Sequence, residues 1–269
     1  MLLVSIVLAT LAGGILSVVA AAILSHALLA SWVPRMVSFA VGALLRAAFL
    51  DLLPEAMESG IGAQRLFGTV LIGLLGFFLL EKFALWRHSH GEGSKAQAGA
   101  DSDSAGAHAH HAHGHGHHGS RIKPSGMMIV VGDSLHNLVD GVVIAAAFLS
   151  DVTVGWAVAI AVIAHEIPQE VGDFMVLLDA GYTKARALAM NILSSLASVA
   201  GGVIGYFALG HLGDVIPYVQ ALAAASLIYI AVADLVPELH RRYSARDALS
   251  QIVLIGLGIG IVWFAGTGR

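Results

Sequence analysis

HNLVDG at residues 136–141 and HEIPQE at residues 165–170 are the two stretches that decide how this chain folds. Each lies inside a long apolar segment, where lipid makes acids and imidazoles expensive. Within each stretch these side chains recur at the spacing of one helical turn, so they share a helix face. Polar groups placed in this way inside membrane helices require a cation to balance them. The two stretches therefore predict a path that carries a metal ion across a bilayer.

The composition indicates an integral membrane protein. Of the 269 residues, 57% are hydrophobic and 12% are charged, and the mean hydropathy is +0.82. A soluble domain carries about 25% charged residues. The chain has no cysteine, which excludes disulfides and thiolate ligands, so nitrogen and oxygen atoms must hold any metal. We expect a divalent metal ion and the lipid bilayer as partners, no cofactor and no nucleic acid, and we leave a homodimer open.

Eight segments are long enough to cross the hydrocarbon core, which takes about 20 helical residues. They are 2–24, 35–58, 65–86, 125–149, 152–178, 184–209, 216–240 and 248–266. Pro34, Pro124 and Pro217 stand at the starts of the second, fourth and seventh segments, where a missing N–H is harmless. We therefore predict an all-α integral membrane protein with eight transmembrane helices. No signal-peptide pattern precedes the first segment, so we expect it to stay in the membrane.

The basic residues predict the orientation of the chain. One set of loops, with the adjoining helix ends, holds eleven Lys and Arg residues, whereas the other side holds only Arg65 and Arg269. Arg46 is the one base well inside a predicted span. Because positive charge marks the cytoplasmic side, we expect a multi-pass protein of the cell membrane with both termini outside.

Residues 87–123 form a long linker on the predicted cytoplasmic side. The linker is rich in Gly, Ala, Ser and Asp and contains nine histidines between His88 and His118. A segment with so little apolar surface to bury is expected to be disordered. Weak, exchangeable metal binding is one interpretation of its histidines, and a solvated linker without a required role is the other. We expect transport to survive its removal.

One short motif occurs twice, as DLLPE at 51–55 and as DLVPE at 234–238. Both copies lie late in their helices, and the two helices cross the membrane in opposite directions. This predicts an inverted repeat of spans 1–3 and 6–8 around spans 4 and 5, which is a signature of transporters. The corresponding division of the chain is 1–86 for spans 1–3, 87–123 for the His-rich loop, 124–180 for spans 4–5 with the metal site, and 181–269 for spans 6–8.

The fourth and fifth spans each carry a polar stripe. The stripes consist of Asp133, His136, Asn137 and Asp140 in the fourth span, and of His165, Glu166, Gln169, Glu170 and Asp173 in the fifth. Facing each other, they would surround a cavity with imidazole, carboxylate and amide groups, which suit zinc, iron and manganese. The set exceeds the four ligands of a tetrahedral zinc ion, so two adjacent metal positions and one ion that exchanges ligands both remain open. Asp133 and Asp173 are open to a supporting role that orients the histidines.

The charge balance favours a cationic path. The predicted spans hold nine acids well inside them and only one base, Arg46, so some carboxylates must be protonated, hydrated or bound to metal. Pro168 cannot donate to the carbonyl of Ala164 and is expected to kink the fifth helix beside the ligands. Asn191, Ser194 and Ser195 have two interpretations: they face the site from the sixth span, or they are ordinary helix-packing positions, which we favour. The glycines Gly73, Gly76, Gly201 and Gly202 are interpreted as positions of close helix packing.

The same motifs resemble those of the ZIP (Zrt/Irt-like) family of divalent metal transporters, over essentially the whole chain. HEIPQEVGDF at 165–174 is similar to the HExPHExGDF signature of the LIV-1 branch, and HNLVDG is similar to that branch's HNxxDG. The resemblance implies uptake of zinc or a related divalent metal into the cytosol, a binuclear site between the fourth and fifth helices, and an elevator-like motion. The ligands that it implies are His136, Asn137, Asp140, His165, Glu166, Gln169 and Glu170.

Gln169 departs from this family pattern, because the branch usually has histidine there. An amide is a weaker and harder ligand than an imidazole. The resemblance makes Zn²⁺ the first expectation for the transported ion, whereas Gln169 weakens the preference for zinc and favours Fe²⁺, Mn²⁺ or a broad selectivity that includes Cd²⁺ as alternatives.

Two other classes of protein share part of this pattern. An intramembrane zinc protease uses HExxH, but here Gln169 replaces the second histidine and Pro168 disrupts the helix. A cation-diffusion exporter also combines a His-rich loop with intramembrane His and Asp, but it usually has six spans and a soluble C-terminal domain. A passive channel is not distinguished from a transporter by sequence. We expect a transporter and not an enzyme.

Overall fold

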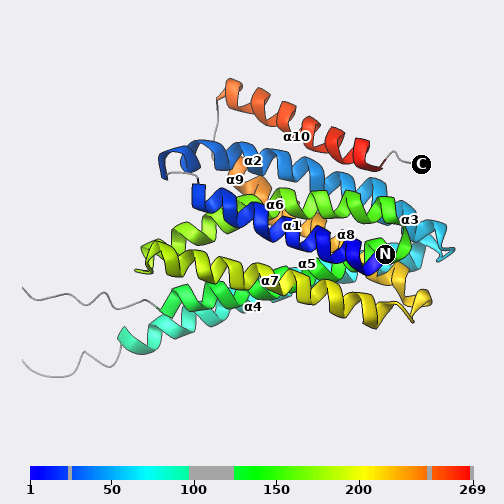
Figure 1. The fold of residues 1–269 in the computed structure, drawn as a ribbon, viewed down its shortest axis with the longest axis horizontal. Helices are drawn as coiled ribbons and strands as arrows, with labels where there is room; N and C mark the ends of the chain where they lie inside the picture. The colour runs from blue at the N-terminus through cyan, green and yellow to red at the C-terminus, as the bar shows by residue number, and fades with distance from the viewer. Residues whose placement is uncertain (24–25, 97–123, 241–243, 267–269) are drawn as a thin grey trace, which may run out of the picture.

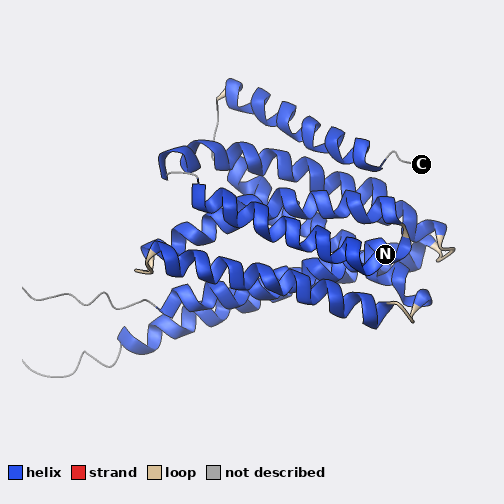
Figure 2. Cartoon of the chain, in the orientation of Figure 1, coloured by secondary structure: helices blue, strands red, loops and turns tan. Residues whose placement is uncertain are grey.

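The computed structural model describes residues 1–23, 26–96, 124–240 and 244–266, and the elements within these ranges are all helical (Figure 2). Eight stretches of this described part are long and apolar enough to cross a membrane. The predicted all-α membrane protein with eight spans is therefore confirmed. The elements are α1 (Leu2–Ile23), α2 (His26–Arg46), η1 (Ala47–Leu52), α3 (Leu53–Glu58), α4 (Ala63–Ala96), α5 (Pro124–Ser150), α6 (Val152–Asp179), α7 (Lys184–Leu209), η2 (Gly213–Val215), α8 (Ile216–Tyr229), η3 (Ile230–Leu235), α9 (Val236–Leu239) and α10 (Ala245–Gly266).

Two predicted helix ends differ from the observed ones. Pro34 lies inside α2 and not at its start, because α2 begins eight residues earlier, at His26. The helix α4 continues to Ala96, beyond the end predicted at residue 86. The rest of the predicted His-rich loop, residues 97–123, lies outside the described residues, so its predicted disorder stays a prediction.

The second and seventh spans each contain a π-helix, η1 and η3, directly before the repeated motif turns into a final short α-helix. In both, the first residue after the π-helix donates its N–H five residues back, Leu53 to Ala48 and Val236 to Ala231. A proline follows in each case, Pro54 or Pro237. A proline has no N–H and its ring clashes with the carbonyl four residues earlier, and the extra residue of a π-turn relieves that clash. The predicted 3+2+3 arrangement of the whole chain and the predicted domain boundaries remain predictions.

Glycines allow the closest helix contacts. A Cβ atom at Gly141 of α5 would lie 1.9 Å from Ser198 O of α7, and one at Gly201 of α7 would lie 2.0 Å from Leu138 O of α5. The helix α10 packs in the same way along α2 at the edge of the molecule (Figure 1). The predicted close packing at Gly201 is confirmed. The same prediction for Gly76 is wrong, because a Cβ there would meet open space.

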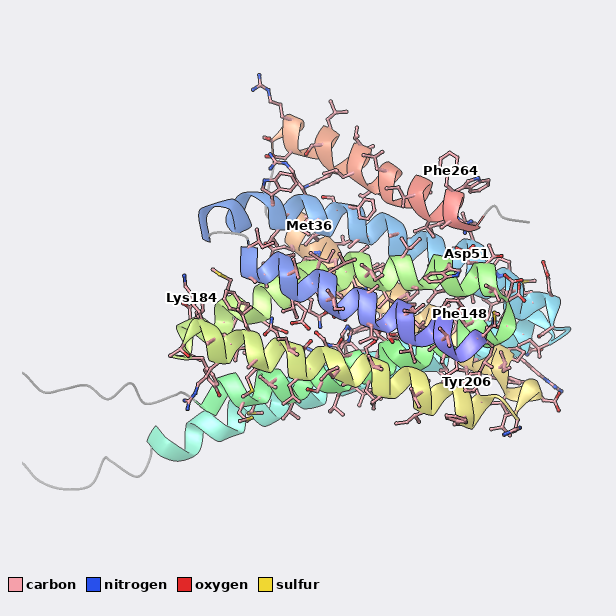
Figure 3. The ribbon with its side chains drawn as sticks, viewed as in Figure 1. Met36, Asp51, Phe148, Lys184, Tyr206 and Phe264 are labelled. Atoms are coloured by element: carbon pink, nitrogen blue, oxygen red, sulfur yellow. The ribbon has the colours of Figure 1, made fainter. Side chains whose placement is uncertain are left out.

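Only Asp151 separates α5 from α6, so the two helices form a tight hairpin. The Asp151 carboxylate caps α6 by accepting hydrogen bonds from the backbone N–H groups of Thr153, at 2.7 Å, and Val154, at 3.0 Å. Near this turn Phe148 of α5, labelled in Figure 3, meets Trp156 of α6 edge to face, with ring centroids 5.3 Å apart. The hairpin therefore fixes the register between the two helices that carry the predicted metal ligands.

Candidate metal site

Four of the seven predicted ligands meet between α5 and α6. They are His136, Asp140, His165 and Glu166, and one possible ligand atom from each lies within 4.8 Å of the others. His165 Nε2 lies 3.1 Å from Asp140 Oδ2 and 3.2 Å from His136 Nε2. Glu166 Oε1 lies 3.7 Å from His165 Nε2 and 3.8 Å from His136 Nε2.

These separations fit a shared metal ion. Two ligand atoms that each lie about 2.1 Å from a tetrahedral zinc ion are about 3.4 Å from each other. The measured distances of 3.1–3.8 Å between the imidazole nitrogens and the carboxylate oxygens span that value. One ion at the centre of the cluster would contact all four side chains after small side-chain adjustments.

The side chain of His165 is already oriented for such a contact. Its Nδ1 lies 3.4 Å from the carbonyl oxygen of Ala161, one helical turn earlier. This arrangement favours the tautomer in which Nδ1 carries the proton and Nε2 is open to a metal. His165 is 1% exposed, whereas the side chain of His136 is 27% exposed, so the cluster is reached from the side of His136.

The two predicted amide ligands are both hydrogen-bonded to Asp133. Asn137 Nδ2 donates to Asp133 Oδ1 at 3.2 Å, and Gln169 Nε2 donates to the same oxygen at 3.0 Å. Asp133 therefore orients the two amides, whereas the supporting role left open for it above concerned the histidines.

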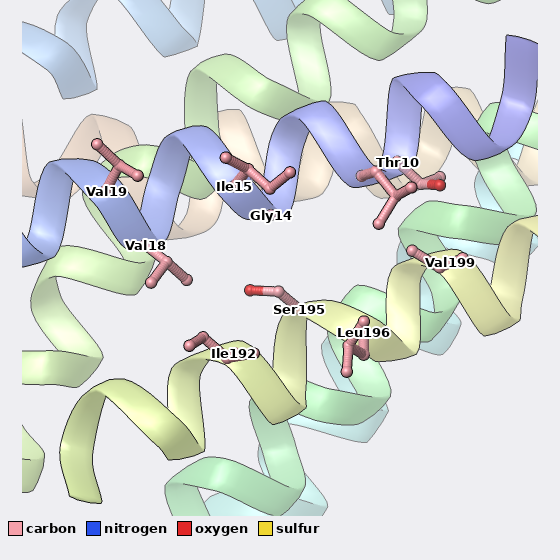
Figure 4. A pocket seen from close by; sticks show the side chains of 10 residues that line it. Thr10, Gly14, Ile15, Val18, Val19, Ile192, Ser195, Leu196 and Val199 are labelled. Carbon is pink, nitrogen blue, oxygen red and sulfur yellow. The ribbon is translucent and has the colours of Figure 1, made fainter. Parts of the chain in front are cut away.

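Glu170, the seventh predicted ligand, is fully buried and is positioned by α7. Ser195 Oγ donates to Glu170 Oε1, and Asn191 Nδ2 donates to the Glu170 carbonyl, each at 2.8 Å. Ser195 extends from α7 toward α1 (Figure 4), where a Cβ at Gly14 would lie 2.9 Å from its Cβ. These hydrogen bonds favour the interpretation of Asn191 and Ser195 as residues that face the site over that of ordinary packing residues. Their spacing of four in the sixth span, facing the fifth, is the one signal that indicated a role at the site.

A cavity of about 310 Å³ leads to the cluster from one end of the bundle. We call it the vestibule. It is lined by Ile129, Gly132, Asp133, His136, Gln169, Asp173 and Asp234. Since α5 begins and α6 ends beside it, the vestibule opens toward the end where α4 connects to α5.

The cluster contains two carboxylates and neither a lysine nor an arginine. Among the buried residues of the described ranges Arg46 is the one Lys or Arg, and it pairs with Asp51. Asp140 Oδ1 and Glu166 Oε1 are buried and accept no hydrogen bond within the described part of the chain. Buried carboxylate oxygens without donors are costly, and a cation between them removes that cost.

Comparisons with known proteins show which family the sequence resembles. A model of the ZIP zinc transporter family matches residues 1–266. Zinc transporter ZIP13 of Gallus gallus is 29% identical over 264 residues, which cover 85% of this chain and 72% of that protein. Zinc transporter foi of Drosophila melanogaster is 39% identical over 136 residues, and zinc transporter ZIP10 of Danio rerio is 37% identical over 142 residues. These two matches each cover 50% of this chain but only 19% and 17% of those longer proteins.

Proposed function

This chain belongs to the ZIP zinc transporter family, and we propose that it carries a divalent transition metal ion across the membrane through the cluster between α5 and α6. The relatives found belong to the LIV-1 branch that the motifs predicted. The observation that carries the proposal is the convergence of two imidazoles and two buried carboxylates without a neutralising base. Because the relatives are named as zinc transporters, zinc is the first candidate substrate, with iron, manganese and cadmium as alternatives.

The seven predicted ligands have two roles in this proposal. His136, Asp140, His165 and Glu166 hold the ion in the conformation described. Asn137 and Gln169, whose N–H groups donate to Asp133, contribute their amide oxygens as the ion moves, and Glu170 contributes its second oxygen, which accepts no hydrogen bond within the described residues. An ion that exchanges ligands in this way is not held too tightly to leave.

Access to the cluster from one side supports alternating access. The vestibule reaches His136 from the end where α4 connects to α5, which is the predicted cytoplasmic end. On the opposite side of the cluster, Ile144 of α5 and Val158 and Val162 of α6 are buried in the apolar core. We propose that this conformation releases metal into the cytosol, and that a second conformation exposes the same cluster to the outside.

The two alternative functions, an intramembrane zinc protease and a cation-diffusion exporter, are less well supported. The relatives are transporters, and Gln169, at the position of the second protease histidine, donates to Asp133. Membership of the ZIP family replaces the interpretation as a cation-diffusion exporter.

Metal uptake into proteoliposomes tests the proposal. We expect His165→Ala and His136→Ala to reduce uptake of radioactive zinc by about 10- to 100-fold, the usual effect of disturbing a metal site. His211→Ala is the matched control, because His211 is exposed and lies in a different element, beyond α7. Wild-type uptake in both His165→Ala and His136→Ala would contradict the site. The same assay with iron, manganese and cadmium ranks the substrates.

The orientation of the chain in the membrane is tested separately by cysteine labelling. Because the sequence has no cysteine, a single introduced cysteine is the one thiol that reacts. Ser59 is exposed in the turn between α3 and α4, on the predicted outer side. We expect Ser59→Cys in intact cells to react with a membrane-impermeant maleimide. Labelling only after the membrane is opened would reverse the proposed direction of the chain.

A further inference from the structure

Arg46 and Asp51 form a buried ion pair far from the metal cluster. Arg46 Nη1 lies 2.7 Å from Asp51 Oδ2, and the two side chains are 6% and 8% exposed. The guanidinium also lies over the ring of Trp263 in α10, 5.2 Å from its centroid. Figure 3 shows Asp51 near the end of α10 that carries Phe264. A buried ion pair stabilises a protein little more than an apolar pair of similar size, so stability alone does not explain this pair.

The π-helix creates the pairing. Arg46 precedes η1 and Asp51 lies within it, five residues later. In an α-helix, residues five apart point about 140° away from each other, at about 100° per residue. The wider π-turn brings positions i and i+5 to the same face. The π-helix η1 therefore places the permanently charged Arg46 side chain against the Asp51 carboxylate.

The second copy of the motif has a different residue at the position before its π-helix. Asp234 occupies the position in η3 that Asp51 occupies in η1, and Tyr229 stands where Arg46 would be. Asp234 lines the vestibule together with His136 and Gln169. Thus the acid of one copy lines the vestibule, while the acid of the other copy pairs with Arg46.

The Arg46–Asp51 pair lies beside its own cavity, on the other side of the cluster. This cavity of about 160 Å³ is lined by Arg46, Leu50, Asp51, Pro54, Glu55, Thr153, Val154 and Gly266. Thr153 and Val154 begin α6, whereas the vestibule contacts α6 beyond Glu166. The two carboxylates and the hydroxyl in this lining are oxygen groups of the kind that bind hard and borderline divalent cations.

We propose that the side chain of Arg46 occupies a cation-binding position at Asp51, in the cavity on the outer side of the cluster. An incoming divalent ion displaces the guanidinium from Asp51 on its way to the cluster. The inference rests on the transport function proposed above. Arginine suits this role because its guanidinium is always charged and is weakly hydrated, so Trp263 can hold it when it leaves Asp51. The metal ion and the guanidinium of Arg46 compete for the Asp51 carboxylate, so one of the two cations always balances the charge of that carboxylate.

Equilibrium metal binding and uptake kinetics of Arg46→Gln test this role. In Arg46→Gln the guanidinium no longer competes with metal for Asp51, so we expect one additional zinc equivalent per chain and a KM for uptake lowered about fivefold or more, the lower end of typical coupling between sites. The added equivalent should disappear in Arg46→Gln combined with Asp51→Asn. Arg65→Gln is the matched control, since Arg65 is exposed at the start of α4 on the same side of the bundle.

A folded Arg46→Gln protein with the wild-type KM and the wild-type zinc stoichiometry would overturn the inference. If Arg46→Gln does not fold, Arg46→Lys decides, because lysine keeps the charge but loses the planar fork and the stacking on Trp263. We expect the same direction of change, smaller in size, and a wild-type KM would again overturn the inference. Wild-type protein that binds zinc but takes up no metal would contradict the transport function, while the binding comparison would still decide the role of Arg46.

Discussion

Gly141→Ala tests whether the packing of α5 on α7 sets the geometry of the metal cluster. The added Cβ would lie 1.9 Å from Ser198 O and 2.6 Å from Gly202 N, both backbone atoms of α7. Ordinary contact begins at 3.4 Å, so the two helices must separate by 1.5 Å at this point. Neither neighbour is the flexible end of a side chain. The strain therefore falls on the helix positions themselves.

The size of the effect follows from the position of Gly141 directly after Asp140. Overpacking a well-packed interior costs about 1–3 kcal/mol, of which the better helix propensity of alanine returns about 1 kcal/mol. Metal–ligand distances tolerate only about ±0.2 Å, far less than the required separation. We therefore expect a small loss of stability and a weakening of metal affinity by about 10- to 100-fold, as for other changes that misplace ligands.

Thermal unfolding in detergent and zinc uptake in proteoliposomes measure the two parts of this prediction. Gly256→Ala in α10 is the control, because a Cβ there meets open space, and we expect it to leave both quantities unchanged or to raise the Tm slightly. A Gly141→Ala protein with wild-type Tm and wild-type KM would refute the argument that this contact positions Asp140.

Three further predictions concern the site itself. Gln169→His places an imidazole beside His136 in the vestibule and should shift a metal panel toward zinc; an unaltered profile would count against a role of Gln169 in selectivity. Ser195→Ala removes the donor to the Glu170 carboxylate, a contact of about 1.5–3 kcal/mol, and should lower zinc affinity by isothermal titration, whereas Ser194→Ala, whose hydroxyl bonds only to its own helix, should not. Zinc at about 100 times its Kd should stabilise the wild-type fold by about 2.7 kcal/mol in chemical denaturation, and the same gain in His165→Ala would argue against that ligand.

The eight spans could be predicted from the sequence because lipid leaves few alternatives to long apolar helices. The interruptions within them were harder to predict. Pro54 and Pro237 indicated irregular helix, but a kink, a break and a π-turn all satisfy a missing N–H, and only the packed structure selects among them. Pro34 was misplaced because hydropathy does not mark where a helix begins in the interfacial region.

The site was predictable in composition but not in its division of roles. Spacing along one helix indicates which residues share a face, so His136 and Asp140 could be grouped, as could His165 and Glu166. Which side chains then meet depends on how the two helices are rotated against a third. Here the glycine contacts between α5 and α7 and the hydrogen bond from Ser195 set that rotation, and sequence spacing within a single helix carries no information about it.

The one-residue connection between α5 and α6 has a mechanical consequence. Asp140 and His165 stand at similar distances from Asp151, on two helices that cannot slide past each other without unwinding that turn. Any rearrangement that opens the opposite face must therefore move the hairpin as a stiff unit. The pocket would then travel with its cargo as one piece, so any exchange of ligands on the way has to come from rotation of side chains inside the hairpin and not from sliding of its two helices.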